Sequence, residues 1–145
     1  MDKITVREFT YTLEDAKKLK EIDSVTFKDC NYEERKIIEI SKNPQNKIFI
    51  AEYDDLSVGF ISLIEVQTLH YHGLWVDLIA VKPEFQKLGV GQKLLEYGQR
   101  YGKELKVDMM SALVATNNHA SKRSFEKREF LSVDKEYNLY LYEQE

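Results

Sequence analysis

The order of the predicted elements places this chain in the α/β class, with a mixed, mostly antiparallel central sheet of about six or seven strands. Three strand-like segments follow one another directly within residues 48–81, which favours hairpins and therefore antiparallel pairing. After them come a helix and another strand, and a strand-helix-strand crossover joins strands that run parallel. The two patterns together predict a sheet of mixed direction.

The first third of the chain predicts one strand and two helices. Residues 4–9 alternate between apolar and polar side chains, as a strand with one buried face does. Residues 13–27 and 32–40 carry apolar side chains at helical spacing, and Asn43-Pro44 ends the second of these helices. In the first helix the spaced residues are Leu13, Ala16, Leu19, Ile22 and Val25.

The rest of the chain begins with three strands, at residues 48–53, 58–68 and 74–81. Asp54-Asp55 forms the first turn, and Pro83 closes the third strand because proline cannot donate to a sheet ladder. A helix of about four turns is expected next, with Val90, Leu94, Tyr97, Tyr101 and Leu105 on its apolar face. The last expected elements are a strand at 110–115, a helix at 118–127 and a strand at 137–142.

Composition and charge bound the class of protein. The 145 residues are 43% hydrophobic and 32% charged, which fits one domain spanning residues 1–145. No apolar run approaches membrane-spanning length and the first residues lack a signal-peptide core, so we expect a cytoplasmic protein with no membrane partner. Cys30 is alone, which excludes an internal disulfide. A net charge of −4 and the lack of a basic stretch disfavour nucleic acid as a partner.

The turn before the helix at residues 90–105 has the features of an anion site. Gly89 and Gly91 let the backbone approach a phosphate, and the first N–H groups of a helix lack intrahelical partners and carry partial positive charge. A dinucleotide fingerprint would need glycine where Leu94 stands, and the glycine-lysine pair of a P-loop is absent. Lys87 and Lys93 flank the turn. These residues alone leave open both an empty turn and a pyrophosphate site.

Two segments resemble motifs of the GCN5-related N-acetyltransferase (GNAT) family. Residues 81–95 (Val-Lys-Pro-Glu-Phe-Gln-Lys-Leu-Gly-Val-Gly-Gln-Lys-Leu-Leu) are similar to the family's acetyl-CoA motif, Gln/Arg-x-x-Gly-x-Gly/Ala, which Val-x-Pro often precedes. Residues 118–130, one strand later, are similar to Asn-x-x-Ala/Ser-x-x-Phe/Leu-Tyr-Glu-Lys-x-Gly-Phe. The order of elements also resembles that fold, which implies helices on both faces of the sheet and a splay between its fourth and fifth strands.

The resemblance implies acetyl-CoA as cosubstrate and no metal. In the family, the N–H groups of the glycine turn hold the CoA pyrophosphate, and the pantetheine arm pairs with a bulged, splayed strand, here near Ile79 and Val81. A backbone N–H near Ile79 could polarise the thioester carbonyl. The residues implied to bind the cofactor are Ile79, Val81, Gln86, Lys87, Leu88, Gly89, Val90, Gly91, Gln92, Asn118, Ser121 and Phe125.

The implied reaction is direct attack of a primary amine on the thioester within a ternary complex, where holding both reactants together supplies most of the gain. An alkyl ammonium with a pKa of about 10.4 is almost wholly protonated at pH 7, so a base must take its proton. Asp77 is the candidate catalytic base, although it could also be a charge on the solvated face of its strand. Glu52 and Glu65 are further candidates.

Two positions depart from the family pattern. The family helix usually carries a tyrosine that protonates the departing thiolate, and Phe125 stands there instead. Because a thiol has a pKa of about 8.5, departure as thiolate at pH 7 costs only roughly 2 kcal/mol. Tyr97, Tyr137 or Tyr140 could supply the proton instead. Glu129 replaces the glycine that usually ends the helix, which predicts a different helix exit.

Other polar groups favour ordinary surface roles. His70 and His72 have a spacing seen in some metal sites, but no third ligand is near. An acidic group surrounds the break between the first two helices, which borders the acceptor site in the family, and could attract a cationic amine or simply be solvated. Its members are Asp23, Asp29, Glu33 and Glu34.

The sequence therefore predicts transfer of an acetyl group from acetyl-CoA to a primary amine of a small molecule or protein, with a cationic small molecule among the acceptors considered. Two alternatives stay open: a non-catalytic acyl-CoA-binding or sensor domain, and a structural domain whose turn is empty. By analogy with the family, a monomer or a homodimer is expected. The acceptor is not fixed, because proteins that share a fold can differ in substrate.

Overall fold

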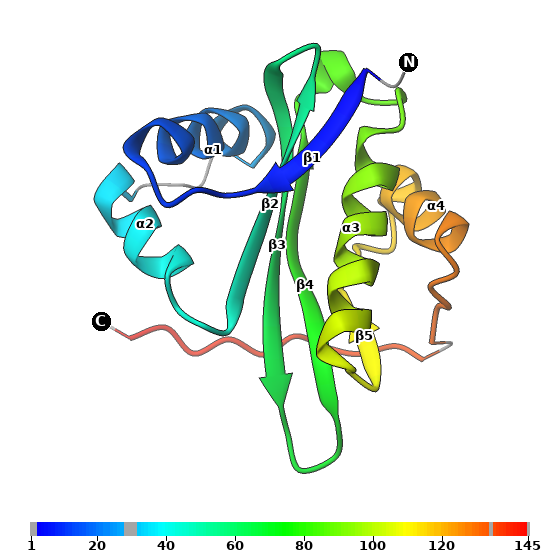
Figure 1. Cartoon of the computed structure of the whole chain (residues 1–145). Coiled ribbons are helices and arrows are strands. Elements are labelled where there is room, and N and C mark those ends of the chain that lie inside the picture. Colours follow the sequence, from blue (N-terminus) through cyan, green and yellow to red (C-terminus); the bar gives the residue numbers. More distant parts are fainter. Residues whose placement is uncertain (1–2, 28–31, 134, 145) are drawn as a thin grey trace.

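The computed structural model describes residues 3–27, 32–133 and 135–144. Two helices cover one face of a twisted sheet and two cover the other, as Figure 1 shows. The elements are β1 (Ile4–Glu8), α1 (Leu13–Thr26), α2 (Glu34–Ser41), β2 (Asn46–Tyr53), β3 (Leu56–Gln67), β4 (His72–Val81), a 3-10 turn (Pro83–Phe85), α3 (Val90–Leu105), β5 (Met109–Ser111) and α4 (His119–Lys127). None of the described helices is long and apolar enough to cross a membrane.

The sheet has the order β1-β2-β3-β4-β5 and is of mixed direction. The first four strands pair antiparallel, and β4 pairs parallel with β5. The fold is therefore the expected mixed α/β type, but the number of strands was wrong: the described residues form five, not six or seven.

The error lies in the last part of the chain. Residues 137–142 form no strand, and β5 ends at Ser111 rather than Ala115. Tyr137, Leu139 and Leu141 alternate as strand residues do, yet each is about three-quarters exposed (74%, 76% and 75%). Alternation specifies which face of a strand is apolar, but a strand also needs a neighbouring edge, and no described strand pairs with this segment.

One extra residue in β4 changes the direction of its side chains. Leu63 of β3 lies opposite Val76 of β4, and its neighbour Ser62 lies opposite Leu78. Asp77, between Val76 and Leu78, therefore has no partner on β3 and forms a β-bulge. Because side chains alternate with period two, one inserted residue exchanges the faces of all those that follow. Val76 therefore shares the α3 side of the sheet with Ile79 rather than with Leu78.

Two apolar layers hold the helices to the sheet. Phe49, Ile61, Leu63, Leu94 and Leu95 are buried between the sheet and α3. On the opposite face, α1 and α2 bury a second layer, made of Phe9, Ala16, Leu19, Ile22, Ile37, Ile50, Phe60 and Ala80. The helical spacing predicted for the first helix is confirmed by the burial of Ala16, Leu19 and Ile22.

The start of α3 lies very close to the sheet. A Cβ atom at Gly59 of β3 would come within 2.7 Å of the Ala80 carbonyl oxygen and 3.3 Å of the Val90 and Leu94 side chains. Only glycine fits this space without displacing backbone. The close packing fixes the beginning of α3, and with it the glycine turn, against the end of β4.

A partly buried ion pair ties the first strand to the first helix. Arg7 donates from Nη1 and Nη2 to the two carboxylate oxygens of Asp15, at 2.7 and 2.8 Å. Thr10 adds hydrogen bonds from its amide and its hydroxyl, at 2.9 and 2.8 Å. The hydrogen bonds from Arg7 hold the pKa of the Asp15 carboxyl well below its usual range, against the opposing effect of burial.

We expect Asp15→Asn to lower the free energy of unfolding at pH 7 by about 2 kcal/mol, the typical contribution of hydrogen bonds to a charged group. Because the pKa of Asp15 is depressed in the folded state, its contribution is complete above the unfolded pKa and is lost as the pH falls. The difference between variant and wild type should therefore shrink below about pH 4. Urea unfolding at pH 7 and pH 3 measures both values.

Glu14→Gln is the matched control, because Glu14 is the neighbouring acid of α1 and its side chain is 79% exposed beside Lys18. That change should alter the unfolding free energy by no more than about 0.5 kcal/mol. Equal stability of Asp15→Asn and wild type at pH 7 would contradict the assigned role of the pair.

Candidate active site

The glycine turn begins directly after β4 and the 3-10 turn. Gly89 is the N-cap of α3 with a φ of 92°, in the left-handed region that favours glycine. No side chain caps α3 there. A Cβ atom at Gly91 would have no neighbour within 4 Å, so the space beside the first turn of α3 is open. Backbone N–H groups without a capping side chain, next to open space, are suited to an anionic ligand.

Side chains around the turn brace it. Gln86 donates from Nε2 to the Val81 carbonyl oxygen at 3.1 Å, across the turn. Gln92 of α3 donates from Nε2 to the Ser124 carbonyl oxygen of α4 at 2.8 Å. The side chains of these two residues therefore maintain the shape of the site.

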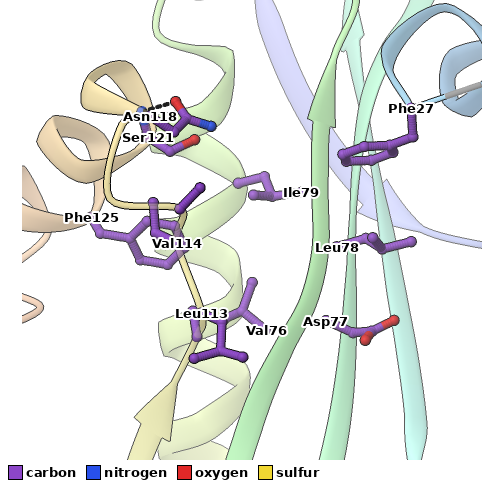
Figure 2. A pocket seen from close by; sticks show the side chains of 12 residues that line it. Phe27, Val76, Asp77, Leu78, Ile79, Leu113, Val114, Asn118, Ser121 and Phe125 are labelled. Atoms are coloured by element: carbon purple, nitrogen blue, oxygen red, sulfur yellow. Dashed lines mark hydrogen bonds between the residues drawn. The ribbon is translucent and has the colours of Figure 1, made fainter. Parts of the chain in front are cut away.

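A cleft opens where β4 and β5 separate. Their pairing ends at Trp75 and Ser111. Beyond this point lies a cavity of about 150 Å³, here called the strand cleft. Its lining residues are Phe27, Val76, Asp77, Leu78, Ile79, Ala112, Leu113, Val114, Ala115, Asn118, Ser121 and Phe125. In Figure 2 the side chains of Val76 and Ile79 point from β4 towards Val114 and Phe125.

Helix α4 presents three of the predicted residues to the strand cleft. Asn118 is its N-cap, and the Asn118 Oδ1 atom accepts a hydrogen bond from the Ser121 amide at 3.1 Å. Ser121 and Phe125 are one helical turn apart and both line the cleft. Phe125 also packs edge-on against Phe130, with ring centroids 5.1 Å apart. The cleft therefore has a polar end at Asn118 and Ser121, and an aromatic wall at Phe125.

A second, larger cavity lies on the other face of the sheet, between that face and helices α1 and α2. It measures about 500 Å³ and is here called the helix cavity. Phe27, Asp77 and Leu78 line both the helix cavity and the strand cleft. Figure 2 shows Asp77 and Leu78 on the side of β4 opposite Val76 and Ile79. The two cavities thus meet at the bulge of β4, and Asp77 is the ionisable group at their junction.

The structure separates Asp77 from the other acids considered as bases. Glu52 accepts a hydrogen bond from Arg7 Nε at 3.1 Å, and Glu65 pairs with His72 at 2.6 Å. Neither lines the strand cleft or the helix cavity. Among the residues that the structure describes, no group of three possible ligands could hold a metal ion, His70 and His72 included.

The tyrosines suggested as proton donors lie elsewhere. Tyr97 of α3 packs against Phe49 of β2 and against Arg100 of its own helix. Tyr137 and Tyr140, near the end of the chain, are 74% and 87% exposed. None of the three lines either cavity. The helix exit at Glu129 has a φ of 69°, so this residue adopts the left-handed conformation that glycine usually takes there.

Several lining residues were not expected from the sequence. Phe27 follows the last turn of α1 and lines both cavities, and Tyr32 lines the helix cavity. Their aromatic type was visible, but nothing in the sequence distinguished them from residues of the apolar core. Asp23 of the acidic group lines the helix cavity, whereas Asp29 and Cys30 fall outside the described residues.

The comparison with protein families identifies the class. The model of the acetyltransferase (GNAT) family matches residues 10–130, and the chain belongs to this family. The protein is therefore an acyltransferase enzyme, as the two motifs predicted. No match was found among curated protein sequences.

Solved structures share the fold at low sequence identity. An aminoglycoside acetyltransferase, meta-AAC0020, from an uncultured soil metagenomic sample has a TM-score of 0.86 and 11% identity, with 98% of this chain and 97% of that chain covered. A transcriptional regulator from Bacillus halodurans C-125 has a TM-score of 0.80 and 16% identity, with 95% and 99% covered. AAC(6')-Iy, in complex with the bisubstrate analog CoA-S-monomethyl-acetylneamine, has a TM-score of 0.77 and 18% identity, with 99% of each chain covered.

Proposed function

We propose that this chain, as a single domain, transfers the acetyl group of acetyl-CoA to a primary amine by direct attack in a ternary complex. The observation that carries the proposal is the meeting of the strand cleft and the helix cavity at Asp77. A transferase that works without a covalent intermediate needs two substrates in contact, and two cavities that share lining residues at Asp77 lie next to each other as this requires. AAC(6')-Iy, which shares this fold, binds a bisubstrate analog, CoA-S-monomethyl-acetylneamine. Binding of such an analog supports a site that holds both substrates at once.

The residues proposed to bind acetyl-CoA lie in three groups. The N–H groups from Lys87 to Gln92, beside the open space at Gly91, would hold the pyrophosphate. Ile79 and Val81 would offer backbone groups to the pantetheine arm, because no described strand pairs with this edge of β4 beyond Trp75. Asn118, Ser121 and Phe125 would form the opposite wall.

An alkyl ammonium has to lose two protons in all. Asp77, which lines both cavities, would accept the first directly or through water and leave a neutral amine. The amine nitrogen then attacks the thioester carbon, the carbon-sulfur bond breaks, CoA leaves as thiolate, and the nitrogen loses its second proton to water. The ring of Phe125 has no proton to give, so the thiolate leaves unprotonated at a cost of roughly 2 kcal/mol at pH 7. Positioning of the two substrates then supplies most of the rate gain.

Gly91→Glu tests the proposed phosphate site without straining the fold. The new Cβ atom would touch no protein atom within 4 Å, and an acidic residue in the first turn suits the helix dipole. We expect unchanged or slightly higher thermal stability, together with at least about a 100-fold loss of acetyl-CoA affinity from charge repulsion and blocked access. Calorimetric titration measures the affinity.

Gly91→Gln is the control of equal size and no charge, and it should lose less affinity than Gly91→Glu. Full acetyl-CoA affinity in a folded Gly91→Glu variant would mean that the phosphates bind elsewhere.

Asp77→Asn tests the proposed base. We expect kcat to fall by about 100- to 10,000-fold, the range of general-base catalysis, with acetyl-CoA affinity unchanged. The loss should be smaller for an acceptor amine that is already mostly neutral at the assay pH, because less proton removal is required. Thiol release with two amines of different pKa measures both effects.

Asp55→Asn, in the exposed turn between β2 and β3, is the matched control and should have wild-type kinetics. If the Asp77→Asn defect were the same size for both amines, Asp77 would position the acceptor rather than act as the base.

A further inference from the structure

The described residues that line the helix cavity are mostly apolar. Among them, Asp23 and Asp77 carry carboxyl groups, and Ser62 and Tyr32 carry hydroxyl groups. The apolar walls are formed by Leu19, Phe27, Tyr32, Ile37, Ile40, Ile48, Phe60 and Leu78. Its volume of about 500 Å³ falls within the range of small-molecule sites.

The walls of the cavity come from different parts of the chain. Ile37 and Ile40 belong to α2, Leu19 to α1, and Ile48 and Phe60 to the face of the sheet that both helices cover. Phe60 is 1% exposed and Ile37 6%, so these parts of the wall belong to the packed core. These buried side chains have no room to move away, so the inner part of the lining stays apolar. The outer part is exposed and is formed by Phe27, Tyr32, Ile40 and Leu78.

Only one of the two carboxyl groups is placed for the transfer itself. Asp77 lines both the helix cavity and the strand cleft, where the acetyl group would arrive, whereas Asp23 lines the helix cavity and not the strand cleft. Asp23 is only 6% exposed and adds a second carboxylate to the wall, so the cavity favours a cation over an anion. Hydroxyl or ammonium groups of an acceptor that lie against the inner apolar wall would lose water without gaining a hydrogen bond from the described residues there, which disfavours their binding.

We propose that the acceptor of this enzyme is a small monoamine whose amino group is attached to an apolar body, alkyl or aromatic. This inference rests on the proposed acetyl transfer and names its acceptor class. It separates this chain from the aminoglycoside acetyltransferases that share its fold, because an aminoglycoside carries several amino and hydroxyl groups on sugar rings. The alkyl or aromatic body would occupy the helix cavity, with the amino group at Asp77.

The test compares amines on the full-length chain after acetyl-CoA binding has been measured by calorimetry. Thiol release is followed with ethylamine, hexylamine, 2-phenylethylamine, spermidine, kanamycin and a lysine-containing peptide. Hexylamine and 2-phenylethylamine should exceed ethylamine in kcat/KM by about 100-fold, because each additional buried methylene favours binding. Spermidine, kanamycin and the peptide should not exceed ethylamine.

The outcomes separate the two proposals. Preference for spermidine, kanamycin or the peptide would overturn the apolar-acceptor inference and leave acetyl transfer standing. Equal kcat/KM for ethylamine and hexylamine would overturn it as well. Absence of acetyl-CoA binding would instead defeat the proposed function on which the inference rests.

A variant locates the preference in the helix cavity. Ile40 lines the cavity and is 38% exposed, so Ile40→Glu places a charge at its wall without burying it fully. We expect the ratio of kcat/KM for hexylamine to that for ethylamine to fall about 10-fold, with acetyl-CoA affinity reporting an intact fold.

Leu56→Glu is the control. Leu56 is 51% exposed at the start of β3 and lines neither cavity, so its change should leave the ratio unchanged. An unchanged ratio in Ile40→Glu would place the acceptor's apolar body outside the helix cavity.

Discussion

The arrangement of the site depends on a single extra residue in β4. Without the bulge at Asp77, strict alternation would direct Val76, Leu78 and Ala80 to one face of the sheet. With it, Val76 and Ile79 face the α3 side, while Asp77 and Leu78 both face α1 and α2. The bulge thus gives a carboxylate to the helix cavity and an apolar surface to the strand cleft at one point of the strand. It also increases local twist, which suits the divergence of β4 from β5.

That divergence explains why the site is open at all. The β4–β5 pairing ends after three residues on each strand, so the remaining edge of β4 keeps backbone N–H and C=O groups that no described strand satisfies. Such groups require partners from water or from a ligand. A ligand that carries amide groups of its own can pair with this edge as a strand would. The close approach of α3 at Gly59 holds the glycine turn, which precedes α3, near the end of β4.

Turn residues and the spacing of apolar side chains made the glycine turn and the order of the helices and strands up to α4 predictable from the sequence. The bulge at Asp77 was not derivable from the residues themselves, because it depends on how β4 aligns with β3, and only the family resemblance implied one. The expected strand at residues 137–142 failed for a related reason: its apolar pattern was real, but pairing depends on an available edge. The helix cavity was also missed, because Leu19 and Ile37 have the same sequence pattern whether they fill a core or line a hollow. Contacts between distant segments decide such features.

The apolar cavity bears on how a carboxylate could act as the base. In water an aspartate with a pKa of about 3.9 is a poor acceptor for the proton of an ammonium with a pKa of about 10.4, a mismatch of roughly 9 kcal/mol. Asp77 is exposed, so an amine that reaches it from solvent still carries its water. Binding of an apolar amine in the helix cavity would remove water from around the ammonium, which disfavours its charged form, lowers the pKa of the amine and narrows the mismatch when transfer is needed. On the proposed mechanism, the same walls that select the acceptor would also make its nitrogen a competent nucleophile, without an acid at Phe125.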